Sequence, residues 1–132
     1  MKKVKTFLLL AVLTLLTSMN VFANMSGDFM KLEDLNGTSY WVYIDSGEYA
    51  KNRWIQTPDE RWFYAGSDTI LYQNKWLNNE DGKWYYFGKD CSMLHDTTTP
   101  DGFQVGSDGA WIKDGQVVVE NVKSIDGNVE IK

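Results

Sequence analysis

Aromatic residues return every 22 positions through the middle of the sequence. The repeat has three neighbouring columns, which are Tyr40, Trp62 and Trp84, then Trp41, Phe63 and Tyr85, and then Val42, Tyr64 and Tyr86. No insertion or deletion interrupts this spacing. A fixed period of this length is typical of architectures in which small units pack on their neighbours. The chain is therefore expected to contain a row of similar units.

Each unit has the pattern of a β-hairpin. Trp84 and Tyr86 alternate with Tyr85 and Phe87, as residues on opposite faces of a strand do. The turn formers of residues 88–92 then break the alternation, and Met93 can begin the returning strand. Aromatic side chains favour such pleated surfaces.

Stacking of hairpins gives the expected fold. One hairpin buries too little apolar surface to be stable alone, but stacked copies share a core. We predict an all-β fold, a short β-hairpin solenoid whose three 22-residue repeats cover residues 37–97. After Thr97 the register fails, and residues 98–112 are expected to form a closing hairpin that caps the stack. Residues 113–132 are expected to be a tail or an edge hairpin, with no function assigned.

The N-terminus has the pattern of a signal peptide. Lys2, Lys3 and Lys5 precede an apolar run, and small residues at Val21 and Ala23 offer a cleavage site. The run is too short to span a bilayer. Residues 1–23 are therefore expected to be removed and residues 24–36 to be a linker or cap, which predicts a secreted protein without membrane insertion.

The charge of the chain limits its expected binding partners, and its cysteine content limits its disulfides. Removing the signal peptide leaves 10 basic residues against 18 acidic ones, which disfavours nucleic acid and anionic membranes as partners. Cys91 is the only cysteine, so no disulfide can form within the chain, and we expect a free thiol at the surface.

The third repeat resembles a known family. Trp76, the run Asp81-Gly82-Lys83-Trp84-Tyr85-Tyr86-Phe87, Asp90 and Met93 are similar to the cell-wall-binding repeat of choline-binding proteins. Repeats of glucan-binding and clostridial toxin proteins are also similar. The resemblance covers about residues 37–97. It implies a left-handed superhelix of hairpins at the surface of a Gram-positive bacterium, with ligand sites between successive hairpins and no cofactor.

The resemblance also implies site residues. In choline-binding members, a cage combines the Trp that ends one hairpin with the first aromatic of the next strand and with aromatic or Met side chains of the following hairpin. When this cage pattern is transferred to the matching positions of the present sequence, one site would use Trp54, Trp62, Tyr86 and Met93. A second would begin with Trp76 and Trp84 and be completed by Phe103 or Trp111.

Two ligand chemistries fit such aromatic sites. A quaternary ammonium is attracted by cation–π interaction, and a sugar ring packs its apolar face on Trp or Tyr. Choline-bearing teichoic acid and glucan are thus both expected partners. Arg53 and Lys75, which stand where the family has Gly, favour a sugar or an anionic polymer over a cation.

We expect no enzyme and no metal site. Cys91 and His95 are four residues apart across a turn, which gives no reason for thiol and imidazole to meet, and a surface position is expected for His95. No second His or Cys supplies a metal set. The function expected is noncovalent attachment to cell-wall or extracellular polysaccharide. The alternative is a structural or protein–protein interaction repeat that self-associates, for example through an edge strand at the tail.

Overall fold

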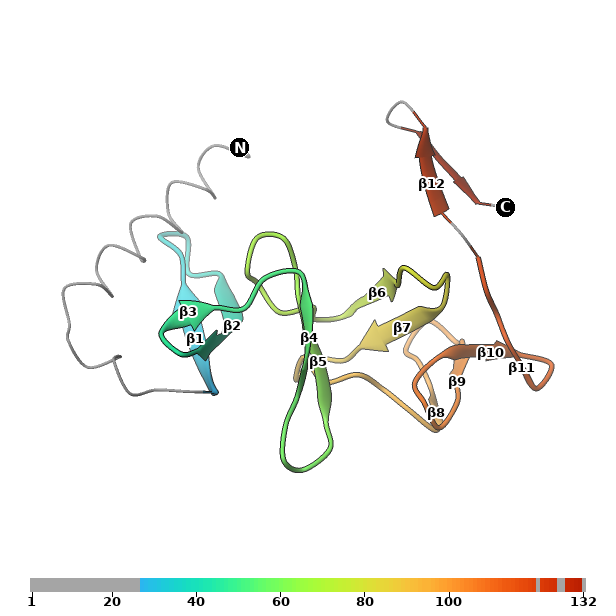
Figure 1. Ribbon diagram of the computed structural model, residues 1–132, viewed down its shortest axis with the longest axis horizontal. Coiled ribbons are helices and arrows are strands. Elements are labelled where there is room, and N and C mark those ends of the chain that lie inside the picture. Colours follow the sequence, from blue (N-terminus) through green and yellow to red (C-terminus); the bar gives the residue numbers. More distant parts are fainter. Residues whose placement is uncertain (1–26, 121, 126–127, 132) are drawn as a thin grey trace. The chain divides into compact units, whose positions relative to one another are not determined.

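The computed structural model describes residues 27–120, 122–125 and 128–131. The predicted signal peptide, residues 1–23, lies outside this described part. All regular elements in the described residues are β-strands, and their pairing is antiparallel (Figure 1). The predicted all-β fold class, with hairpins as its units, is confirmed.

The chain divides into two compact units. The first contains the residues up to Trp54 together with Tyr64–Leu71, and the second contains Ile55–Phe63 and the residues from Tyr72 onward. The boundary passes through the hairpin of β4 (Arg53–Gln56) and β5 (Trp62–Ala65).

The first unit begins with a three-stranded sheet. Strand β1 (Asp28–Glu33) pairs along its whole length with β2 (Ser39–Asp45), which also pairs with β3 (Glu48–Tyr49). The segment 24–36, expected as a linker or cap, thus contributes a strand. The buried apolar side chains of this unit are Val42, Ile44, Ala50, Ala65 and Leu71.

Backbone hydrogen bonds join consecutive segments of the first unit. The Leu71 N–H donates to the Trp41 carbonyl at 2.8 Å, and Val42 forms a β-bridge with Ile70. Residues 70 and 71 follow β5 in the chain, so the segment after one hairpin returns to the strand of the preceding one.

The second unit contains the third repeat and the closing segment. Strand β6 (Lys75–Asn78) pairs with β7 (Trp84–Phe87). A four-stranded sheet follows, in the order β11-β10-β9-β8. Its strands are β8 (Thr97–Thr98), β9 (Gln104–Val105), β10 (Trp111–Lys113) and β11 (Gln116–Val117).

Backbone contacts also join consecutive segments of the second unit. The Met93 N–H donates to the Trp62 carbonyl at 2.7 Å, and the Leu94 N–H donates to the Tyr86 carbonyl at 2.9 Å. Further along, Tyr85 forms a β-bridge with Ala110. Phe87, Cys91 and Ala110 lie almost fully buried beneath these contacts. Each aromatic strand is therefore held by the segment that follows it, as expected of a repeat.

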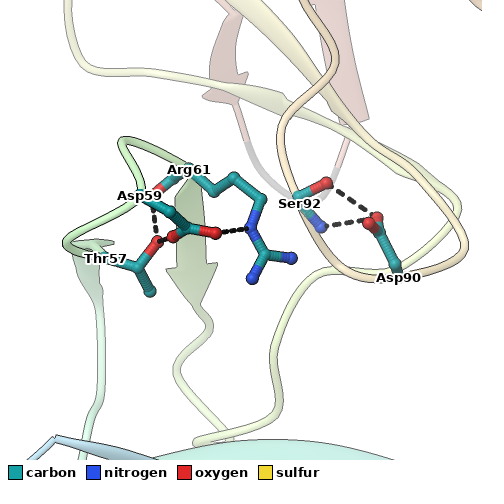
Figure 2. A network of polar contacts seen from close by, with 5 residues as sticks. All are labelled: Thr57, Asp59, Arg61, Asp90 and Ser92. Carbon is teal, nitrogen blue, oxygen red and sulfur yellow. Dashed lines mark hydrogen bonds and ion pairs between the residues drawn. The ribbon is translucent and has the colours of Figure 1, made fainter.

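One type of turn recurs in the second repeat, the third repeat and the closing segment. The N–H groups of Gly66, Gly88 and Gly106 each donate to the carbonyl four residues ahead. Within these turns, the carboxylates of Asp68, Asp90 and Asp108 each accept the backbone N–H two residues ahead, at 3.0 to 3.1 Å. Figure 2 shows this bond for Asp90 and Ser92. The turn aspartates are thus explained by local hydrogen bonds.

A second type of turn lies at the opposite end of the hairpins. In the copy at residues 57–61 the Thr57 N–H donates to the Arg61 carbonyl, while Asp59 accepts from the Thr57 hydroxyl and the Arg61 guanidinium (Figure 2). The same backbone bonds occur at residues 34–38, 79–83 and 99–103.

The thiol of Cys91 is buried, so the expectation of a surface thiol is wrong. Cys91 has a φ of 67° and Thr69 a φ of 69°, the left-handed conformation that Gly109 adopts at the equivalent turn with a φ of 81°. This conformation turns the Cys91 side chain into the core, where it is 1% exposed. Burial raises the pKa of the thiol to about 11.

The last described strands form a separate hairpin. Strand β12 (Val122–Ile125) pairs in antiparallel register with β13 (Asn128–Ile131). Among the described residues, no helix has the length and apolar character needed to cross a bilayer.

Candidate functional site: an aromatic pocket with two carboxylates

The second unit contains a cavity of about 240 Å³ with aromatic walls. Its lining residues are Trp76, Trp84, Asp101, Phe103, Trp111 and Glu120. The three indoles are half-buried, and Phe103 is 41% exposed. The cavity therefore combines apolar ring surface with access to solvent.

The β6–β7 hairpin supplies the first wall. Trp76 pairs with Tyr86 and Asn78 pairs with Trp84. Cross-strand partners, and residues two apart on a strand, share one face of a sheet. Trp76 and Trp84 therefore stand on the same face of the hairpin.

The closing segment supplies the second wall through edge-to-face rings. The ring centroids of Trp76 and Phe103 lie 5.8 Å apart with an interplanar angle of 88°, and those of Phe103 and Trp111 lie 5.3 Å apart at 85°. On its other side Trp76 packs against Tyr86 at 5.2 Å. Each such pair contributes about 0.5 to 1.5 kcal/mol beyond area burial. The rings thus hold one another in place.

Asp101 fixes one of these rings by a polar contact. Its Oδ2 accepts the indole N–H of Trp76 at 2.9 Å, and its Oδ1 accepts the Thr99 hydroxyl. These two hydrogen bonds, first that of Thr99 and then that of Trp76, lower the pKa of the Asp101 carboxyl below its usual value. The pocket therefore carries a negative charge at neutral pH beside an oriented indole.

Glu120 lies outside the repeat but lines the same pocket. Its backbone N–H donates to the Gly82 carbonyl at 2.8 Å, and its carbonyl accepts the Asn78 side-chain amide at 2.9 Å. The preceding residue, Val119, forms a β-bridge with Lys83. Sequence reasoning missed Glu120, because no repeat or motif in residues 113–132 indicates that this segment returns to the β6–β7 turn.

The structure brings together the residues predicted for the second site. Trp76 and Trp84 line one cavity with both Phe103 and Trp111, the residues named to complete it. This placement was predicted from the family resemblance, whereas the two carboxylates were not.

The residues predicted for the first site are distributed differently. Trp62 and Met93 are joined by a backbone hydrogen bond, while the ring of Tyr86 is buried and packs on Trp76 of the second site. Trp54 lies in the first unit, edge-to-face with Tyr64 at 5.5 Å. A ligand role for Trp54, Trp62, Tyr86 and Met93 remains a prediction.

The two basic residues expected to disfavour a cation have other partners. The Lys75 ammonium lies 3.9 Å from the ring centroid of Tyr72, and Arg53 forms an ion pair with Asp45 at 3.0 Å. Lys75 is adjacent to Trp76 on a strand, so its side chain leaves from the opposite face. Neither residue lines the pocket.

The two side chains weighed as a nucleophile and a base, Cys91 and His95, lie in different surroundings. The Cys91 thiol is buried, whereas His95 is exposed, as expected, and contacts Asp96 at 3.0 Å. Thiol and imidazole therefore do not form a nucleophile and base pair. No group of three or more metal-ligating side chains gathers within the part of the chain described.

Comparisons with known proteins agree with this geometry. Residues 70–111 match the model of the choline-binding repeat. The choline binding domain of Spr1274 from Streptococcus pneumoniae is similar in structure, with 25% identity and a TM-score of 0.52, over 69% of this chain and 99% of that domain. Choline binding protein F of the same organism, solved with a peptidoglycan analogue, has 25% identity and a TM-score of 0.50, over 67% of this chain and 27% of that protein.

By direct sequence comparison, no curated protein matches the chain. The matched segment begins within the second repeat and ends at Trp111, so it contains every aromatic residue of the pocket but not Glu120. The predicted resemblance to the choline-binding repeat is therefore confirmed for residues 70–111 of this chain.

Proposed function

We propose that the aromatic pocket binds a quaternary ammonium group, such as the choline carried by a cell-wall polymer. The chain would then be a secreted, noncatalytic module that attaches without covalent bonds to the wall of a Gram-positive bacterium. One observation carries this proposal: the residues that line a single cavity are three tryptophans, one phenylalanine and two acidic residues.

The chemistry of the walls favours a cation over a sugar. A trimethylammonium group has no N–H to donate, so it needs ring faces and negative charge rather than hydrogen-bond acceptors in fixed positions. Cation–π contacts contribute about 0.5 to 2 kcal/mol each, and more when the site is desolvated. The negative charges of Asp101 and Glu120, which both line the pocket, further attract a cation.

A sugar would find few donors here. The indole N–H of Trp76 is already bonded to Asp101, and the indole N–H of Trp84 is buried with no acceptor among the described residues. The charged lining groups are carboxylates, which accept but do not donate hydrogen bonds. Glucan therefore ranks second as a ligand. The choline binding of the similar domain of Spr1274 supports the same order.

Titration followed by tryptophan fluorescence tests the ligand. Choline chloride is expected to give a saturable change, whereas glucan oligomers are expected to give none. Trp76→Leu and Trp111→Leu are expected to weaken choline binding at least tenfold. Trp41→Leu is the matched control, since Trp41 is a half-buried indole in the first unit and does not line the pocket.

The same variants test attachment to a polymer. Wild-type protein is expected to be retained on isolated choline-bearing cell walls and to be eluted by free choline, but not by soluble sugar. Retention that persists in Trp76→Leu, with circular dichroism unchanged, would contradict the proposal. So would elution by sugar alone.

A further inference from the structure

The segment Val118–Glu120 runs from β10 to the β6–β7 turn, and its last residue lines the pocket. Three backbone contacts hold it: the Val118 N–H donates to the Trp111 carbonyl at 2.9 Å, Val119 forms a β-bridge with Lys83, and the Glu120 N–H donates to the Gly82 carbonyl. The Asn78 amide adds a fourth contact, to the Glu120 carbonyl. The backbone of residue 120 is therefore fixed on both sides.

This segment is independent of the repeat. It lies beyond residue 111, where the match to the choline-binding repeat ends. It nevertheless joins β10, which contains Trp111, to the β6–β7 turn, which directly precedes Trp84. The cavity is thus lined by residues from three stretches of the chain, around β6–β7, residues 101–111 and residue 120.

Resting on the proposed function, we infer that Val118–Glu120 completes the cage and that Glu120, together with Asp101, makes the pocket select positive charge rather than shape. Asp101 is held by Trp76 and Thr99, and Glu120 is held through its backbone. Aromatic rings attract a cation by cation–π contact, but their faces also pack on the methyl groups of a neutral group of the same form. Fixed carboxylates act only on the charged form.

A pair of ligands separates charge from shape. Choline and 3,3-dimethyl-1-butanol share the same branched head and hydroxyl tail, but the second has a neutral carbon in place of nitrogen. The quantity to measure is the ratio of their dissociation constants, by calorimetry at an ionic strength near 0.15 M. Nearby carboxylates at a half-exposed site act through a high dielectric and are partly screened at this salt concentration.

Removing the Glu120 charge should lower this selectivity. In Glu120→Gln the affinity for choline is expected to fall about three- to tenfold, equivalent to about 0.6 to 1.4 kcal/mol. The affinity for the neutral analogue is expected to change by less than about twofold. Asp101→Asn should act in the same direction while its amide oxygen still accepts the Trp76 N–H, and the double variant should lose more than either single variant.

The matched control is Glu80→Gln. Glu80 is an exposed carboxylate in the turn of residues 79–83, and it does not line the pocket. Its removal makes the same change in net charge in the same unit, so the ratio should stay at the wild-type value. A fall as large as that of Glu120→Gln would mean that net charge, not the cage, sets the selectivity, and would overturn the inference.

Positioning by the segment has its own readout. Asn78→Ala removes the amide that holds the Glu120 carbonyl but leaves both carboxylates in place. A lowered selectivity ratio in this variant supports a positioning role for the segment Val118–Glu120, and an unchanged ratio refutes that role. If choline and the neutral analogue both bind and the ratio is the same in Glu120→Gln as in wild type, the inference fails while the proposed function stands. If neither ligand binds the wild-type protein, the proposed function itself fails.

Discussion

Gly109→Ala is expected to destabilise the second unit through both its backbone and its neighbours. Gly109 has a φ of +81°, and a Cβ built on it would lie 2.5 Å from the Met93 Cε, 2.6 Å from its sulfur and 3.1 Å from the Leu94 carbonyl oxygen. Gly102 offers a matched comparison, because its φ is +92° and nothing lies within 4 Å of the corresponding Cβ. Both residues sit in turns of the closing segment.

The two substitutions share a backbone cost and differ in steric cost. A left-handed conformation costs a residue with a Cβ about 1 to 2 kcal/mol, partly offset by about 0.4 to 1 kcal/mol from the stiffer unfolded chain. Gly102→Ala should therefore lower the free energy of unfolding by about 1 kcal/mol. Gly109→Ala must also move the flexible end of Met93 and shift the Leu94 carbonyl oxygen slightly, which adds about 1 kcal/mol.

Urea denaturation followed by tryptophan fluorescence measures the difference. We expect the midpoint to fall in the order wild type, Gly102→Ala, Gly109→Ala, with unchanged slopes, so that the comparison reports stability rather than a change in the unfolded state. Equal losses in the two variants would refute the reasoning, because the close approach of Met93 to Gly109 would then carry no energetic weight.

Further predictions concern three other side chains. The Cys91 thiol, with a pKa of about 11, should react with a thiol reagent at pH 8 only after denaturant is added, and rapid labelling of the folded protein would contradict its burial. The pKa of Asp101 is lower in the folded chain than the unfolded value of 3.8, so its contribution to stability is fully present above that value and is lost as the pH falls through the folded pKa. Denaturation curves of wild type and Asp101→Asn should therefore converge in acid and separate towards neutral pH. Lys75→Met should lower the free energy of unfolding by about 0.5 to 1 kcal/mol, because the contact with Tyr72 is lost, and should leave choline affinity unchanged.

The repeat period predicted the parts of the fold that depend on local pattern. Strand alternation around Trp84 and Tyr86 placed the β7 strand and its aromatic face, and the turn residues near Asp90 marked the reversal. The same period, read with the family resemblance, brought Trp76 and Trp84 to one site and named Phe103 and Trp111 as its completion. Such features follow from spacing because consecutive hairpins contact one another in a fixed register.

Other features depend on tertiary contacts that the sequence repeat does not predict. Cys91 occupies a turn column, where an exposed side chain is the usual expectation, yet its left-handed backbone directs the thiol into the core. Lys75 was expected to oppose a cation, but strand alternation takes its ammonium to Tyr72. Glu120 reaches the pocket through pairing of residues about 40 positions apart, between Asn78 and residue 120. Each outcome is set by tertiary geometry rather than by residue type.

Because three separate stretches of the chain line the pocket, any bound ligand would hold these stretches together. A ligand that touches Trp76, Trp111 and Glu120 together binds only when these distant stretches are assembled, so every bound molecule shifts the balance towards the folded chain. At a concentration 100 times its dissociation constant, such a ligand adds about 2.7 kcal/mol to the free energy of unfolding. Close to a polymer dense in ligand, the second unit would resist unravelling better than it does free in solution.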